Sequence, residues 1–161
     1  MRLSRTQTTI GAFVLSAALT APLAGPAQAD DADMATYARQ GMMNAMQLNA
    51  NPLYAVAKGQ AEYDAAAAAE LAAKLNILAS YPIPSLFLEG TSKADRPGKT
   101  RALADIWADK AKFEQHFSEL RDALAVLADQ AGAGQEAMTA AVAEMGKACG
   151  DCHKAFRAEN Y

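Results

Sequence analysis

The sequence predicts an all-α fold, an antiparallel four-helix bundle, on three observations. Four segments with helical character are separated by turn signals, apolar residues recur at three- and four-residue intervals within them, and no stretch of useful length alternates as a β-strand would. Helices with an apolar stripe bury that stripe against one another. Since most links between the segments are short, we expect neighbouring helices to run antiparallel, with one longer connection crossing an end of the bundle.

The first 29 residues have the features of a secretory signal peptide. Arg2 and Arg5 give a positive start, an apolar stretch follows from residue 10 to about residue 23, and Ala27-Gln28-Ala29 forms a cleavage site. An uncleaved membrane anchor is the alternative, but the apolar stretch contains proline and is short for a membrane span. Cleavage would leave residues 30–161 as one domain, which we expect to be periplasmic and free of the membrane.

The first two helices are bounded by proline and by a capping residue. The first is predicted over about residues 33–49, because the run Asn49-Ala50-Asn51-Pro52 disfavours continuation. The second opens at Asp64, a good N-cap, and consists of the strong helix formers AAAAAELAAKLNILAS before Pro82.

The third and fourth helices follow a long connection at residues 81–99. We expect the third helix over about residues 100–130, ended by Gly132 and Gly134, and the fourth from near Gln135. The third carries the clearest apolar stripe, which consists of Leu103, Ile106, Trp107, Phe113, Phe117, Leu120, Leu124 and Leu127.

A five-residue motif, Cys149-Gly150-Asp151-Cys152-His153, lies in the fourth helix near the C-terminus. A C-x-x-C-H run is the attachment signature of c-type haem. Residues three apart lie on one face of a helix, so both thiols can reach the two vinyl groups of one porphyrin. His153 can offer a neutral imidazole nitrogen to the iron. The motif therefore predicts one haem c, attached through Cys149 and Cys152 and ligated by His153.

Three other interpretations of the motif fit the residues less well. A zinc site needs further ligands, and the chain holds only these two cysteines and one other histidine, His116. A thioredoxin-like dithiol is expected near a βαβ unit, which the pattern does not offer. A disulfide between Cys149 and Cys152 would close too small a loop to constrain the unfolded chain much.

Four segments together resemble the class II cytochromes c, the cytochrome c prime family. They are GKACGDCHKAFR near the C-terminus, IWADKAKFE in the third helix, KGQAEYDAA before the second and RQGMM in the first. The resemblance spans essentially the whole mature chain. It implies a four-helix bundle that holds one haem c in its core, with His153 as the proximal ligand.

The resemblance also implies a choice between two branches of this family, which differ in the residue on the other side of the iron. In the low-spin, methionine-ligated branch, the cytochrome c-556 type, the ligand lies three residues after the position that Gln40 matches. Met43 occupies that place. In the high-spin branch this position usually holds an apolar residue that cannot bind iron.

Helical geometry bears on the choice of methionine. Successive residues turn by about 100°, so Met42 and Met43 cannot both face the iron. The face around Met43 also carries Arg39 and Gln40, a polar pair that suits the propionate carboxylates of a haem. A helical methionine is more often core filling than a metal ligand. Met46, nearly a turn further on the same side, is the main rival.

Three further residues are candidates for positions near a haem. His116 is expected at the edge of the core or on the surface, between Phe113 and Phe117. Phe87, in the long connection, is a candidate to close over the haem edge. Arg157 follows His153 by one helical turn, where it either influences the imidazole or a propionate or is a solvated arginine at a helix end.

Two functions from different classes follow. With His153 and Met43 both bound, the iron would keep its ligands in both oxidation states, which suits a one-electron carrier. The alternative is a binding protein for nitric oxide or carbon monoxide, which needs an open iron position. No nucleophile, carboxylate pair or glycine-rich loop stands at a motif spacing, so an enzyme is not expected.

Charge narrows the expected partners. The formal net charge is −3 at pH 7 and becomes more negative when Arg2 and Arg5 are removed, which disfavours nucleic acid as a partner. Redox partner proteins are expected instead. The sequence leaves open whether the bundle forms a homodimer.

Overall fold

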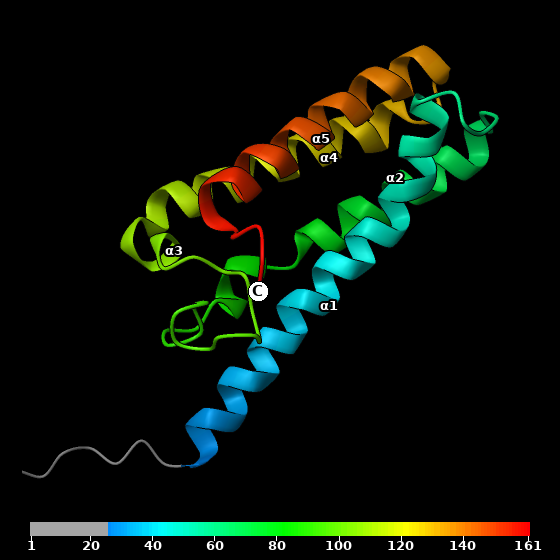
Figure 1. The fold of residues 1–161 in the computed structure, drawn as a ribbon. Helices are drawn as coiled ribbons and strands as arrows, with labels where there is room; N and C mark the ends of the chain where they lie inside the picture. The colour runs from blue at the N-terminus through cyan, green and yellow to red at the C-terminus, as the bar shows by residue number, and fades with distance from the viewer. Residues whose placement is uncertain (1–25) are drawn as a thin grey trace, which may run out of the picture.

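The computed structural model describes residues 26–161. Four long helices, α1 (Pro26–Ala57), α2 (Ala65–Ser80), α4 (Lys110–Gln130) and α5 (Gln135–Phe156), make up most of this part of the chain (Figure 1). A 3₁₀ turn, η1 (Ile83–Leu86), and a four-residue helix, α3 (Asp105–Ala108), lie between α2 and α4. The predicted signal peptide lies outside the described residues, apart from its last four positions.

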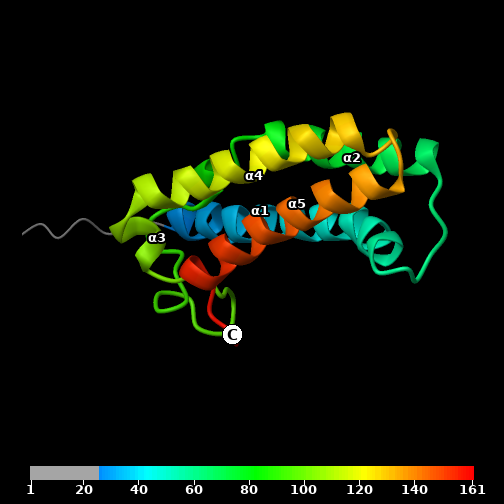
Figure 2. The ribbon, with the colours of Figure 1, turned by 90° about the horizontal axis from the view of Figure 1, so that it is seen from above.

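The long helices pack as an antiparallel bundle. The main contacts join α1 to α2, α2 to α4, α4 to α5 and α5 back to α1, so each helix has two neighbours. Successive long helices run in opposite directions (Figures 1 and 2). The described residues contain no β-strand, and their one isolated bridge joins Ala102 to Arg157. The all-α, four-helix prediction is confirmed.

The first helix is longer than predicted, because it continues through Pro52 to Ala57. Proline cannot donate a hydrogen bond to the carbonyl four residues earlier, at Leu48, and such a loss usually ends a helix. Here Leu48 is 73% exposed, so water can bond to its carbonyl. Leu53, directly after the proline, is 1% exposed and belongs to the core. Burial of this next turn outweighs the local preference, and the predicted end at Asn49 is wrong.

The second helix begins as predicted. The carboxylate of Asp64 accepts a hydrogen bond from the Ala67 amide at 2.8 Å, which satisfies one of the free N–H groups at the start of α2. Its alanines include Ala68, Ala72 and Ala79, all of them buried. A Cβ at Gly132 would lie 3.3 Å from the Cβ of Ala69, so small residues allow α2 to approach the turn between α4 and α5.

The third predicted helix is interrupted. Residues 100–104 are not helical, because they pair with the C-terminal segment: the Leu103 amide donates to the Phe156 carbonyl at 3.0 Å, and the Ala158 amide to the Arg101 carbonyl at 2.8 Å. The chain then forms α3 and leaves helical geometry at Asp109, where φ is −133° and ψ is 67°. The Asp109 carboxylate caps α4 through the Lys112 amide. The long third helix, α4, therefore starts at Lys110, ten residues later than expected, and its predicted end at Gln130 is confirmed.

The core follows the predicted stripe of α4. All of its members that lie in α4 are buried, namely Phe113, Phe117, Leu120, Leu124 and Leu127, and Ile106 in α3 is buried as well. Opposite them lie buried side chains of α5, which include Met138, Val142 and Met145. Near the end of α5, the ring of Phe113 meets the rings of Phe87 and Phe156 edge to face. None of the helices in the described part of the chain is long and apolar enough to cross a membrane.

Candidate haem site

A cavity of about 470 Å³ opens between α1, α4, α5 and the connection that leads to α4. Its volume lies in the range of about 300–1,000 Å³ that cofactor sites usually have. The wall is mostly apolar and is formed by Met43, Met46, Ala50, Leu75, Phe87, Ile106, Phe113, Phe117, Leu120, Leu124, Met145 and Phe156. A large apolar group with a polar edge would be desolvated here.

The motif of α5 brings three chemically active side chains to this cavity. Cys149, Cys152 and His153 all line it and all are half-buried. As free thiols both cysteines are poor nucleophiles at neutral pH: burial raises the pKa of Cys149, and burial together with Cys149 and Glu119 raises that of Cys152 to about 11. Neither thiol forms a disulfide.

His153 is held in its neutral form. Burial lowers the pKa of its imidazole to about 4, and the charges of Arg157 and Arg101 add to this effect. A neutral imidazole is the form that binds a metal. Among the described residues no group of three His, Cys, Asp or Glu side chains is placed to hold a bare metal ion.

These residues fit a haem. Two thiols three positions apart match two vinyl groups, a neutral imidazole stands beside them, and a thioether from α1 lines the same cavity. Cys149 and Cys152 would hold such a group covalently, and His153 would ligate its iron.

The structure brings the predicted methionine to the cavity. Met43 and Met46 both line it, whereas Met42 does not and packs against the core instead. Met46 is 9% exposed and Met43 is half-buried. The predicted difference in direction between Met42 and Met43 is confirmed. The choice between Met43 and Met46 as iron ligand stays a prediction.

Arg39 and Gln40 also line the cavity, but both make contacts that the sequence did not predict. Arg39 is only 3% exposed. Its guanidinium donates hydrogen bonds to the hydroxyl and the carbonyl of Thr91, both at 2.7 Å, and to the Thr100 hydroxyl at 2.9 Å. It also lies 4.7 Å over the ring of Phe87. The Gln40 amide donates to the Lys99 carbonyl at 2.8 Å. Their first role is to fasten the connection to α1.

Arg39 is a positively charged side chain in a buried position. Its pKa falls to about 10, mainly through burial and also through the charge of Arg96. No carboxylate among the described residues pairs with this guanidinium; Asp33 pairs with Arg96 instead. The guanidinium has two further N–H groups beyond the three it uses, so its predicted contact with a propionate stays a prediction.

Sequence reasoning missed part of the cavity wall. His116, expected at the core edge, lines the cavity and packs edge to face on Phe156, with ring centroids 5.8 Å apart. Its Nδ1 lies 3.1 Å from a Glu119 carboxylate oxygen, but the geometry is not that of a hydrogen bond. Arg101 lines the cavity as well. Nothing in the local pattern marked it, because the pairing of residues 101–103 with the C-terminal segment is a tertiary contact.

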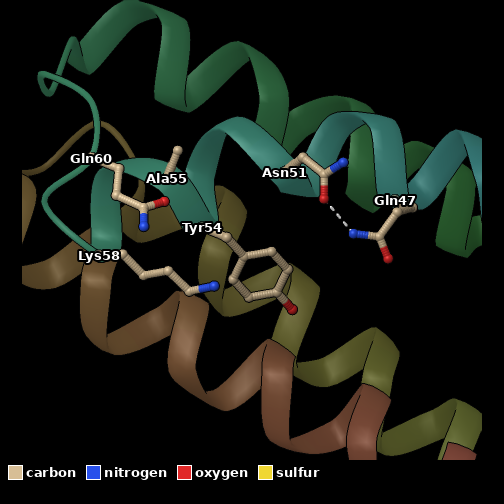
Figure 3. Close-up of a pocket in the computed structure, with 6 residues that line it drawn as sticks. All are labelled: Gln47, Asn51, Tyr54, Ala55, Lys58 and Gln60. Atoms are coloured by element: carbon tan, nitrogen blue, oxygen red, sulfur yellow. Dashed lines mark hydrogen bonds between the residues drawn. The ribbon is translucent and has the colours of Figure 1, made fainter.

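A second hollow of about 460 Å³ lies outside the cavity, along the last turns of α1 (Figure 3). Gln47 and Tyr54 border both spaces. Figure 3 shows the ring of Tyr54 extending from α1 toward α5. A Cβ added at Gly146 would lie 3.4 Å from its hydroxyl oxygen, so glycine makes room for this ring. Burial and the neighbouring Cys149 raise the pKa of Tyr54.

Comparison with known proteins identifies the family to which this fold belongs. The family model described as Cytochrome C' matches residues 34–157, a span that contains Met43 and the complete haem motif. This chain belongs to the cytochrome c' family.

Individual relatives agree with the family assignment. A cytochrome c' of Cereibacter sphaeroides is 42% identical over 144 residues, which cover 89% of this chain and 96% of the relative. A cytochrome c-556 of Rhodopseudomonas palustris is 34% identical over 159 residues, which cover 95% of this chain and 96% of the relative.

Solved cytochrome c' structures share the fold. A cytochrome c' from Rhodobacter sphaeroides superposes with a TM-score of 0.77 at 40% identity and covers 80% of this chain and 98% of its own. A nitric oxide complex of a cytochrome c prime variant from Alcaligenes xylosoxidans has a TM-score of 0.68 at 29% identity, covering 80% of this chain and 97% of its own. The cytochrome c' family binds one haem c covalently.

Proposed function

We propose that this chain is a periplasmic one-electron carrier. In this proposal one haem c is attached through Cys149 and Cys152, with His153 and Met43 as the two iron ligands. The observation that carries it is the shared cavity: the motif of α5 and the thioether of α1 line the same apolar space. The cytochrome c-556 relative, which covers nearly the whole chain, supports the methionine-ligated branch.

The role of the protein's own residues follows from their places. His153 offers a neutral nitrogen, because its pKa of about 4 keeps the proton off at physiological pH. Met43 offers a soft thioether from a rigid helix. When bound, the haem supplies a one-electron couple. Two ligands fixed on packed helices need little movement between oxidation states, and the apolar wall excludes water from the ring.

A second candidate is a binding protein for nitric oxide or carbon monoxide. It is favoured by the nitric oxide complexes of cytochrome c prime variants among the structural neighbours. It requires that Met43 leave the iron or never bind it. Met43 is only half-buried, so its release would not open a sealed core.

An optical spectrum of the purified wild-type protein tests the proposal. Low-spin spectra in both oxidation states, with slow or absent carbon monoxide binding, are expected for an electron carrier. A protein that is high-spin in both states and binds carbon monoxide rapidly would overturn the ligand assignment and favour gas binding.

Location and partners belong to the same proposal. Export would precede haem attachment, and the electron donor and acceptor would be periplasmic proteins. A homodimer is compatible with the proposal but not required by it. No enzymatic role is proposed, since members of this family are haem electron carriers or gas-binding proteins.

A further inference from the structure

Two arginines line the same side of the cavity as His153, and their charges interact. The isolated bridge between Ala102 and Arg157, and the hydrogen bond from the Ala158 amide to the Arg101 carbonyl, hold the C-terminal segment against residues 101–103. Both Arg101 and Arg157 line the cavity together with His153. Figures 1 and 2 both show the C-terminal end folded back beside the connection that leads to α3.

The two cations lack a carboxylate partner. Among the described residues no Asp or Glu lies within ion-pair distance of either guanidinium. Arg101 donates only to the Glu159 main-chain carbonyl, at 3.3 Å, and lies 5.3 Å over the ring of Tyr161. The pKa of Arg157 is lowered by partial burial and by Arg101. Arg101 is half-buried and Arg157 is exposed, and their like charges repel each other, so an anion bound between them would be favourable.

Arg39 is a weaker candidate for binding that anion. Its guanidinium already donates three short hydrogen bonds, all to Thr91 and Thr100. Arg101, by contrast, is half-buried and has most of its five N–H groups free of protein acceptors. The cavity therefore offers a second cationic edge, formed by the C-terminal segment, in addition to the predicted one on α1.

We infer that Arg101 and Arg157 form a carboxylate-binding pair for the propionate groups of the haem, an inference that rests on the haem attachment proposed above. A guanidinium matches a carboxylate with two parallel N–H donors, and such charge-assisted bonds are short and strong. Neutralising propionate charge also favours the reduced iron, because ferrous iron carries one positive charge less than ferric iron. The pair both positions the haem and raises its reduction potential.

The test measures the midpoint potential of holoprotein variants by spectroelectrochemistry. Arg101→Gln and Arg157→Gln each remove one positive charge from the cavity, and Lys154→Gln is the matched control. Lys154 directly follows His153 but is exposed and does not line the cavity. We expect both arginine variants to lower the potential, by about twice the control's shift or more, with a difference that persists at high salt. Arg101→Lys should recover part of the loss.

A resonance Raman spectrum adds a readout that a purely structural role would not move. The propionate bending mode should shift in Arg101→Gln and stay unchanged in Lys154→Gln. The inference is overturned if the arginine and lysine variants lower the potential equally, or if high salt abolishes all three shifts. Failure of the proposed haem attachment would look different, because the wild-type protein would then lose its haem in denaturing acid extraction.

Discussion

The guanidinium of Arg39 binds both the hydroxyl and the main-chain carbonyl of Thr91, a residue 52 positions further along the chain. Thr91 is fully buried and in turn donates its hydroxyl to the Leu88 carbonyl at 2.6 Å. With Thr100 as the third acceptor, one side chain of α1 fixes both ends of the segment from 91 to 100. The buried cation of Arg39 therefore helps to hold the connection on this side of the cavity to α1, together with the Gln40–Lys99 hydrogen bond and the Asp33–Arg96 ion pair.

Arg39→Ala should lower the free energy of unfolding by about 3 kcal/mol, because it leaves buried hydroxyl and carbonyl groups without a donor. Urea unfolding of the holoprotein, followed by circular dichroism, measures this loss. Gln40→Ala is the control: it removes a single solvent-exposed hydrogen bond to the Lys99 carbonyl and should cost under about 1 kcal/mol. Equal losses in the two variants would contradict the role of Arg39.

Pro52→Ala should stabilise the protein by about 1–2 kcal/mol. Alanine restores the hydrogen bond to the Leu48 carbonyl that proline lacks, and the exposed position costs no core packing. Pro97 is also exposed but lies outside any helix. Pro97→Ala should be neutral or slightly destabilising, since its only effect is to raise the conformational entropy of the unfolded chain. Thermal unfolding of both variants checks the opposite signs, and a destabilised Pro52→Ala protein would contradict the account of α1.

Asp95 should make stability depend on pH. Its carboxylate accepts hydrogen bonds from the Ser92 amide and hydroxyl at 3.0 and 2.6 Å, and these bonds lower its pKa below the usual 3.8. Because the folded protein favours the ionised form, this stabilisation is present above pH 3.8 and is lost as the pH falls through the lowered pKa. Asp95→Asn should be less stable than wild type at neutral pH. The difference should close in strong acid, and a constant difference across the pH range would argue against it.

Haem attachment should require both thiols of the motif. The chain contains no other cysteine, so a protein with Cys149→Ser and Cys152→Ser should release any haem on denaturing acid extraction. The experiment needs a host that exports the chain and matures c-type cytochromes. The wild-type protein, extracted in parallel, should retain its haem. Covalent haem in the double variant would refute the attachment sites.

Met43→Ala should convert a low-spin protein to a high-spin one, because alanine offers no iron ligand and leaves a gap beside the metal. The oxidised protein should also lose the weak long-wavelength charge-transfer band that methionine coordination gives. Met42→Ala is the matched control, since Met42 does not line the cavity and should leave the spectrum unchanged.

Met46→Ala decides between the two methionines of the cavity. Because Met46 is a buried core residue, this variant should lose stability but stay low-spin if Met43 is the ligand. Should Met43→Ala stay low-spin while Met46→Ala becomes high-spin, Met46 is the ligand instead.

The sequence predicted those features that depend on short-range pattern. The cap at Asp64, the stripe of α4 and the motif of α5 each involve residues within a few turns of one another. The errors occurred where distant residues decide local structure. Burial of Leu53 carries α1 past Pro52, and pairing with the C-terminal segment unwinds residues 100–104. The Arg101–Arg157 edge of the cavity could not be predicted for the same reason.

The close approach of Tyr54 in α1 to Gly146 in α5 should link the residue sizes that the two positions can accept. A Cβ at 146 would just reach van der Waals contact with the Tyr54 hydroxyl, at 3.4 Å, so a side chain longer than alanine would need a smaller residue at position 54. Substitutions at the two sites should therefore be non-additive. Among relatives, the bulk at one site should fall as the bulk at the other rises, which makes this pair a marker for how each lineage closes the outer end of its haem cavity.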